Sequence, residues 1–148
     1  MTLTEILIAV LFILLLGVVV FPRITHSQLV ADEGAALDSL RSVYLAEQEY
    51  IISHPDVGFT SGLTSLGNTS QAGGSLTIDQ KLATGRKNGY TFIYTPGEKV
   101  NGAIRSYTIT GVPDRVGTTG QRRFFSDESG EIHYNAAGPA DVASPVIQ

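Results

Sequence analysis

The first 22 residues of the chain, MTLTEILIAVLFILLLGVVVFP (1–22), decide how the rest of it can fold. An apolar run extends without interruption from Ile6 to Phe21, with Glu5 directly before it and Pro22 directly after it. As a helix, this run would measure roughly 24 Å, slightly less than the roughly 30 Å hydrocarbon core of a bilayer. With its flanking residues it is long enough to span. The stretch therefore predicts a helix that lies in a membrane or in an apolar bundle.

Two ordinary explanations of such a run do not fit its beginning. Secretory signal peptides open with basic residues and end in small residues before a cleavage site. Here the first residues carry no base, Glu5 is acidic, and no such site follows. A simple membrane anchor has no use for Glu5, because a lone carboxylate near hydrocarbon costs several kcal/mol unless it is paired or protonated.

The partner of Glu5 need not belong to the same molecule. The N-terminal amine, with an intrinsic pKa of about 8, is the one cation near this end of the chain. A neighbouring subunit displaced along the helix axis would present its amine to Glu5 and its own Glu5 to the next subunit. Such a head-to-tail contact does not close on itself, so it generates a helical filament. Glu5 would then set the register between neighbours.

The same residues resemble the mature N-terminus of type IV pilins and of type II secretion pseudopilins. That family has Met or an aromatic residue first, then Thr or Ser, Leu, a variable residue and Glu, with a proline seventeen residues after the Glu. This chain has those residues in place, with Met1, Glu5 and Pro22 as the marks of the pattern. The resemblance implies that a leader is removed before Met1 and that Met1 is N-methylated. It also implies a prepilin peptidase and an assembly platform as partners.

The chain departs from the family pattern in three respects. Thr4 stands where an apolar residue is commoner. Leu14 stands where a glycine is frequent, and Gly17 follows later. There is no cysteine, so the disulfide-bounded loop of many pilins is impossible. These departures favour a subgroup near the pseudopilins, or thin pilins that lack the loop.

Pro22 predicts a weak point in the helix. Proline removes one backbone donor and clashes with the preceding turn, at a cost of about 3 kcal/mol or more in a helix interior. Residues 17–22 also contain flexible Gly17 and three stiff valines, which lowers their helical preference. The resemblance implies that this segment is unwound in the assembled filament, and a simple kink is the alternative.

Beyond Pro22 the helical pattern resumes over residues 24–52. The apolar stripe consists of Val30, Leu37, Tyr44 and Ile51, with Ala36, Leu40 and Val43 beside it. Residues 24–36 are expected to pack on neighbouring subunits, and the later part packs either there or on the chain's own head. His54-Pro55 ends the helix, because the residue before proline avoids the α region. Residues 1–53 thus form one element of roughly 80 Å, of which residues 1–23 are the membrane or filament-core segment.

Residues 54–148 are expected to form a small head. The segment 54–89 joins helix to sheet: residues 58–75 form an exposed loop with one short turn, and a brief helix extends from its cap Thr77 to Ala83 and stops at Gly85. An antiparallel sheet of three or four strands follows within residues 90–135, and a coil lies over the surface in the tail. The expected strands are 90–95, 104–112 and two within 122–135 around a turn at 128–130, and the tail is 136–148.

The expected fold class is therefore α+β, a long N-terminal helix packed on a small antiparallel sheet. Three segments also resemble the globular region of major pseudopilins, which makes the type IV pilin fold the specific expectation. They are LRSVYLAEQEY (40–50), GYTFIYTP (89–96) and RRFFSDESGEIHY (122–134).

The sequence contains no recognisable catalytic constellation. Its three histidines are dispersed, no serine lies in a nucleophile-elbow motif, and no glycine loop has phosphate-binding spacing. We expect no enzyme and no cofactor. Asp127 and Glu128 are a weak calcium candidate, for which a hairpin turn is the better interpretation, and Asn68 is a weak glycosylation candidate. A net charge of −4 gives no reason to expect nucleic-acid binding.

The expected function is structural. The chain would wait in the cytoplasmic membrane as a single-pass precursor with its head outside, and then join copies of itself in an extracellular helical filament, a type IV pilus. The assembly residues would be Met1, Glu5, Gly17 and Pro22. Three alternatives stay open: a major pseudopilin of a type II secretion system, a minor pilin that binds DNA or a surface, and a membrane-tethered enzyme.

Overall fold

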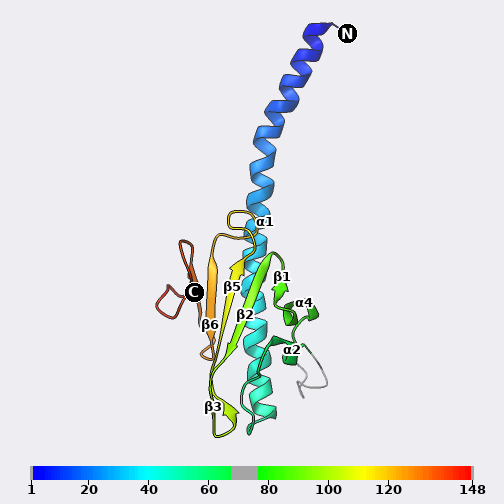
Figure 1. The fold of residues 1–148 in the computed structure, drawn as a ribbon. Helices are drawn as coiled ribbons and strands as arrows, with labels where there is room; N and C mark the ends of the chain where they lie inside the picture. Colours follow the sequence, from blue (N-terminus) through cyan, green and yellow to red (C-terminus); the bar gives the residue numbers. More distant parts are fainter. Residues whose placement is uncertain (1, 68–76, 148) are drawn as a thin grey trace.

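The computed structural model describes residues 2–67 and 77–147, and for residues 17–25 it describes the backbone alone. It is an α+β structure, as expected from the sequence. Helix α1 (Leu3–Ser53) contains 51 residues, about 77 Å at 1.5 Å per residue, and the head lies along its C-terminal part (Figure 1).

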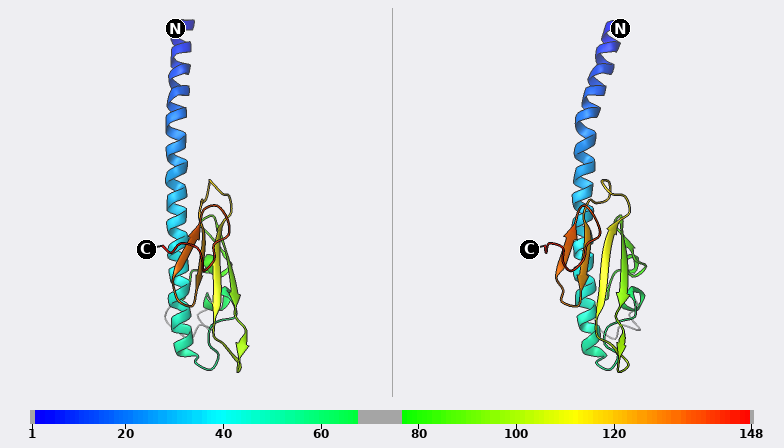
Figure 2. Two further views of the ribbon diagram at one scale, coloured as in Figure 1. Left: turned by 90° about the vertical axis from the view of Figure 1, so that its left-hand side faces the viewer. Right: turned by 60° about the vertical axis from the view of Figure 1, so that its left-hand side comes forward.

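Both ends of α1 follow from local chemistry. Thr2 is extended (φ −84°, ψ 154°) and precedes the first helical residue, and its backbone N–H donates to Oε2 of Glu5 at 2.7 Å. At the other end the N–H of His54 closes the last turn on the carbonyl of Tyr50 at 2.8 Å, and Pro55 prevents continuation. The backbone is helical throughout residues 17–22, without a break in either view of Figure 2. The unwinding expected of this segment refers to the assembled filament and stays a prediction.

The main sheet has five antiparallel strands in the order β1-β2-β5-β6-β7. They are β1 (Arg86–Lys87), β2 (Tyr90–Pro96), β5 (Tyr107–Pro113), β6 (Arg123–Asp127) and β7 (Ile132–Asn135). The expectation of three or four strands missed β1, which the Asn88-Gly89 turn folds back onto β2. Both turn residues have positive φ, 49° and 71°, as a tight two-residue hairpin requires.

A second departure concerns the strand expected over residues 104–112. Its first residue belongs instead to a separate small hairpin, β3 (Lys99–Val100) with β4 (Ala103–Ile104). The turn is Asn101-Gly102, again with positive φ at both residues. Residues 105–106 separate this hairpin from β5. The alternating pattern over residues 104–112 looked like one strand, but the Asn101-Gly102 turn places residue 104 in the preceding hairpin.

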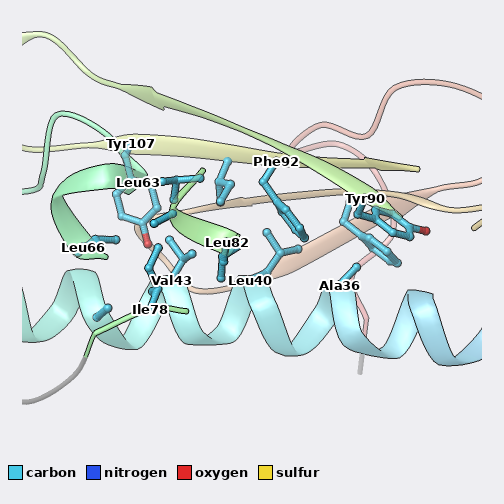
Figure 3. Close-up of a cluster of buried hydrophobic side chains, with 14 of the residues drawn as sticks. Ala36, Leu40, Val43, Leu63, Leu66, Ile78, Leu82, Tyr90, Phe92 and Tyr107 are labelled. Atoms are coloured by element: carbon cyan, nitrogen blue, oxygen red, sulfur yellow. The ribbon is translucent and has the colours of Figure 1, made fainter. Parts of the chain in front are cut away.

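The core lies between α1 and the inner face of the sheet (Figure 3). Inward-pointing strand residues alternate with outward ones, as in β5, where every second residue from Tyr107 is buried. The helix residues at the centre of the buried face are Ala36, Leu40 and Val43, each at most 1% exposed. Of the expected seven-residue series, Leu37 and Ile51 are partly buried against this core, which answers the question of where the later part of the helix packs. Val30 is 54% exposed, and its expected packing on neighbouring subunits stays a prediction.

The connection between helix and sheet is more buried than the sequence suggested. Phe59 and Thr60 are buried, and the short helix α2 (Leu63–Leu66) contributes two buried leucines, so the expected exposed loop is wrong over this stretch. The later helix α4 (Gln80–Ala83) is capped by Asp79, which accepts from the N–H of Lys81 at 2.6 Å. Asp79, two residues nearer the helix than the expected cap Thr77, takes that role because its short carboxylate reaches the second N–H of the turn.

The C-terminal tail covers the outer edge of the sheet beyond β7. The N–H of Tyr134 donates to the carbonyl of Pro145, and the N–H of Ile147 donates to the carbonyl of Ile132, at 2.9 and 2.8 Å. The tail is therefore coil laid on the surface, as expected, and it also pairs with backbone groups that an edge strand would otherwise expose.

Candidate assembly surface on the projecting helix

The N-terminal part of α1 stands clear of the head (Figures 1 and 2). Every large apolar side chain from Leu3 to Leu16 is exposed, from 48% at Ile6 to 82% at Leu3. Soluble monomers rarely present contiguous apolar surface on this scale, and such patches mark sites of interaction. The surface is therefore the first candidate for function.

Apolar side chains occur on all sides of this segment. A helix that is apolar all round is suited to burial on every side and not to packing on one surface. Its environment must therefore surround it. Among the side chains that the structure describes, no helical stretch is long and apolar enough to cross a membrane.

Glu5 is the one acidic residue between Leu3 and Leu16. One of its carboxylate oxygens is already hydrogen-bonded within its own helix. Oε2 accepts the hydrogen bond from the N–H of Thr2, which satisfies one of the free donors at the helix N-terminus. A carboxylate has two acceptor oxygens, and this bond engages one of them. Glu5 lies at one end of a shallow groove whose other lining residues are Ile8, Ala9, Phe12 and Ile13. Met1, its expected partner in a neighbour, lies outside the described residues.

Three of the expected assembly residues, Glu5, Gly17 and Pro22, have a described backbone, and they lie far apart along α1. Along a helix, Gly17 and Pro22 are about 18 and 26 Å from Glu5. These positions are therefore distributed along one helix and form no compact site within the molecule.

Two acidic residues that the sequence did not single out hold α1 on the head. Glu33 is 4% exposed and lies where the helix leaves the head. Its Oε1 accepts from the backbone N–H groups of Gln121 and Arg122 at 2.8 and 3.0 Å. Its Oε2 lies 2.8 Å from Nε and 2.7 Å from Nη2 of Arg122, so both guanidinium nitrogens contact the same carboxylate oxygen. Burial opposes the charge, yet the amide donors and the guanidinium together hold the pKa of Glu33 below its usual value.

Arg122 is itself fixed by aromatic rings. Its guanidinium lies 5.8 Å from the ring centroid of Phe124 and 5.6 Å from that of Tyr134, both in cation–π range. The Glu33–Arg122 pair therefore fixes the point at which the projecting helix emerges from the head.

Glu47 makes the second anchor and is fully buried. Its Oε2 accepts from the N–H of Thr60 at 3.1 Å. Its Oε1 accepts from the hydroxyl of Thr60 and from that of Tyr94, the latter at 2.7 Å. Burial raises the pKa of Glu47, against the lowering effect of these hydrogen bonds.

One signal in the sequence could have found both anchors. Residues 33, 36, 40, 43 and 47 follow the alternating spacing of three and four that marks one helix face. Glu33 and Glu47 lie at the two ends of this line, and the three residues between them are apolar. A pattern search that counts only apolar residues therefore leaves both acids out. An acid at each end of a buried stripe predicts buried partners.

The remaining candidates are structural. Asp127 accepts from the N–H and the hydroxyl of Ser129 at 2.9 and 2.6 Å, which makes the stretch a hairpin turn between β6 and β7. Within the described part of the chain no group of three or more potential metal ligands comes together. His133 is buried under the tail, where its Nδ1 lies 2.7 Å from the carbonyl oxygen of Ser144. Asn68 lies outside the described residues.

Comparison of the chain with models of protein families, with curated proteins and with solved structures gave no match.

Proposed function

We propose that this chain is the structural subunit of a helical filament and that it assembles through its projecting helix, with Glu5 paired to the N-terminal amine of a neighbour. One observation carries the proposal: α1 projects with exposed apolar side chains on all sides and a single acid among them. Among the side chains that the structure describes, Glu33 is the first residue of α1 that is buried, and about 45 Å of helix precedes it. Copies of the same helix would surround that length in a bundle.

The energetics assign separate roles to the apolar residues and to Glu5. Lipid tails are as apolar as leucine, so moving such a helix from a bilayer into a bundle gains little from transfer alone. Close packing and polar pairs must then choose the register. A carboxylate in an apolar bundle is tolerated where it meets a cation, so the register that pairs Glu5 is favoured.

The resemblance to type IV pilins places this proposal in a cellular setting. The precursor waits in the cytoplasmic membrane with its head outside, a peptidase removes the leader and Met1 is methylated, and a platform feeds subunits into an extracellular filament, a type IV pilus. The long helix on a small antiparallel sheet is compatible with the type IV pilin fold. A major pseudopilin of a type II secretion system is the second candidate, and the absence of cysteine agrees both with it and with thin pilins that lack the disulfide-bounded loop.

The proposal is tested on filaments sheared from cells that express the chain. Electron microscopy of these filaments is combined with mass spectrometry of the subunit N-terminus. Filaments built of this chain and starting at a methylated Met1 are expected. Absence of filaments from cells that accumulate the folded protein, with an unmodified initiator Met, would overturn the proposal in favour of a tethered monomer.

Replacing Pro22 with alanine is expected to change filament geometry. Alanine restores the missing N–H and a strong helical preference, so residues 17–22 would stay helical in the assembly. If all six residues are extended in the wild-type filament, the helical form is shorter by up to about 11 Å. The axial rise per subunit, measured by helical reconstruction, is the readout. A Pro22→Ala filament with the wild-type rise and wild-type yield would count against unwinding.

A further inference from the structure

Glu47 is a buried acid that the assembly mechanism does not use. It is fully buried, and none of the ion pairs among the described residues involves it. The groups that face it are the backbone N–H and hydroxyl of Thr60 and the hydroxyl of Tyr94. The next titratable group is Tyr107, whose ring stacks on that of Tyr94 with centroids 5.2 Å apart, and Tyr44 on α1 interacts with Tyr107 in turn.

A buried carboxylate without a cation is costly, whereas its protonated form is cheap if it can donate its proton. The surroundings of Glu47 offer that arrangement. The hydroxyl of Thr60 also lies 3.3 Å from the carbonyl oxygen of Gly62, and the hydroxyl of Tyr94 lies 3.1 Å from the carbonyl oxygen of Thr60. When both hydroxyls turn to these carbonyls, their oxygens become acceptors for a proton on Glu47.

The cluster therefore has two complete hydrogen-bond arrangements with the same heavy-atom positions. In one, the carboxylate accepts three hydrogen bonds. In the other, the neutral acid keeps the bond from the N–H of Thr60 and donates to a hydroxyl. Every polar atom is satisfied in both, so the two differ in the burial of a charge. Opening the cluster to water relieves that cost only when Glu47 is ionised, so ionisation favours the open form.

We propose that Glu47, Thr60 and Tyr94 form a proton-binding site that acts as a latch, closing the segment that carries Thr60 onto the helix and the sheet when a proton is bound. The three residues come from α1, the segment after it and β2, so the site joins the three parts of the head at one point. Phe59, beside Thr60, contacts the ring of Tyr107 edge-on at 5.0 Å and moves with the latch.

The direction of the pH effect follows from the site. In the unfolded chain Glu47 titrates near its usual pKa of 4.5, and in the folded chain its pKa is raised. Between those two values the folded state holds more protons, so stability falls as the pH rises through that window. The stabilising contribution is complete below pH 4.5 and is lost above the folded pKa. Glu33 opposes this trend, since its stabilising contribution is lost as the pH falls below 4.5.

The test compares three full-length proteins in detergent micelles: wild type, Glu47→Gln and the matched control Glu98→Gln, whose carboxylate is exposed. Glutamine imitates the closed latch. Its carbonyl can accept from the N–H of Thr60, and its amide can donate to the two hydroxyls. We expect the unfolding equilibrium constant of wild type, divided by that of Glu47→Gln, to rise with pH. The rise should reach up to tenfold per pH unit between pH 4.5 and the folded-state pKa of Glu47. Wild type divided by Glu98→Gln should show no such rise.

Two further readouts locate the effect. Carbon-13 NMR should show the side-chain carboxyl of Glu47 titrating above 4.5, and hydrogen exchange of the Thr60 amide, compared with its intrinsic rate, should lose protection as that carboxyl ionises. Glu47→Gln should keep the protection at every pH. A Glu47 carboxyl that titrates at or below 4.5, or Thr60 protection that is equally pH-independent in wild type, would overturn the proposal. These measurements are made on the subunit, so their outcome is separate from that of filament assembly.

Discussion

Cells that produce the Glu5→Gln variant are expected to yield at least tenfold fewer filaments than wild type, while the subunit stays folded and membrane-inserted. Removing one member of a buried charge pair costs about 2–5 kcal/mol, because the other member is left without its partner. Each subunit in the filament would lose that contact. Filament yield per mass of subunit, from sheared fractions, is the measurement.

Glutamine separates the two roles of Glu5. The carboxylate accepts from the N–H of Thr2 at 2.7 Å, and glutamine at the third helical position can make the same bond. Glu5→Gln therefore removes the charge and retains the helix cap, whereas Glu5→Ala removes both. Thr4→Ala is the control for a neutral change beside Glu5. A wild-type yield from Glu5→Gln would contradict the pairing, and a loss confined to Glu5→Ala would assign Glu5 to the cap.

Replacing Glu33 with alanine is expected to lower the free energy of unfolding by about 3 kcal/mol. The change leaves two backbone N–H groups and a guanidinium without their acceptor, and each unsatisfied buried donor costs about 1–3 kcal/mol. The side chain of Arg122 is 37% exposed, so water can replace part of the hydrogen bonding that it loses. Denaturant unfolding of the full chain in micelles, above and below pH 4.5, is the measurement.

The two buried glutamates should respond to glutamine in opposite ways. At Glu33 the new amide would place a donor against the guanidinium, so Glu33→Gln is expected to destabilise the chain at pH 7. Because the pKa of Glu33 is held low, its contribution is present above 4.5 and lost in acid, so the cost should shrink as the pH falls. At Glu47 the same substitution should cost little. A Glu33→Gln protein as stable as wild type at pH 7 would remove Glu33 as an anchor.

Much of the architecture could be predicted from the sequence. The run from Ile6 to Phe21 with Pro55 far downstream predicted one long helix, and the alternating segments predicted an antiparallel sheet on it. These signals are local, since they depend on the period of apolar residues and on helix-breaking prolines. The observed α1 and the five-stranded sheet agree with them at that level.

The parts that the sequence did not reveal depend on contacts between distant residues. Glu33 meets Arg122 across 89 positions, and Glu47 meets Tyr94 across 47. The alternating spacing along α1 places both acids on its buried face, but no local pattern identifies the distant residues that they meet. The hairpin at Asn88-Gly89, in contrast, has a local signal in the sequence. The strand before it, β1, was missed because two residues are too few to show an alternating pattern.

The most direct test of the central claim is a helical reconstruction of the filament by electron cryomicroscopy, at a resolution that shows side chains. The projecting helices should fill the centre of the filament, with each Glu5 carboxylate within about 4 Å of the Met1 amine of a neighbour. Filaments whose centre is formed by the heads, or in which Glu5 faces no amine, would contradict it.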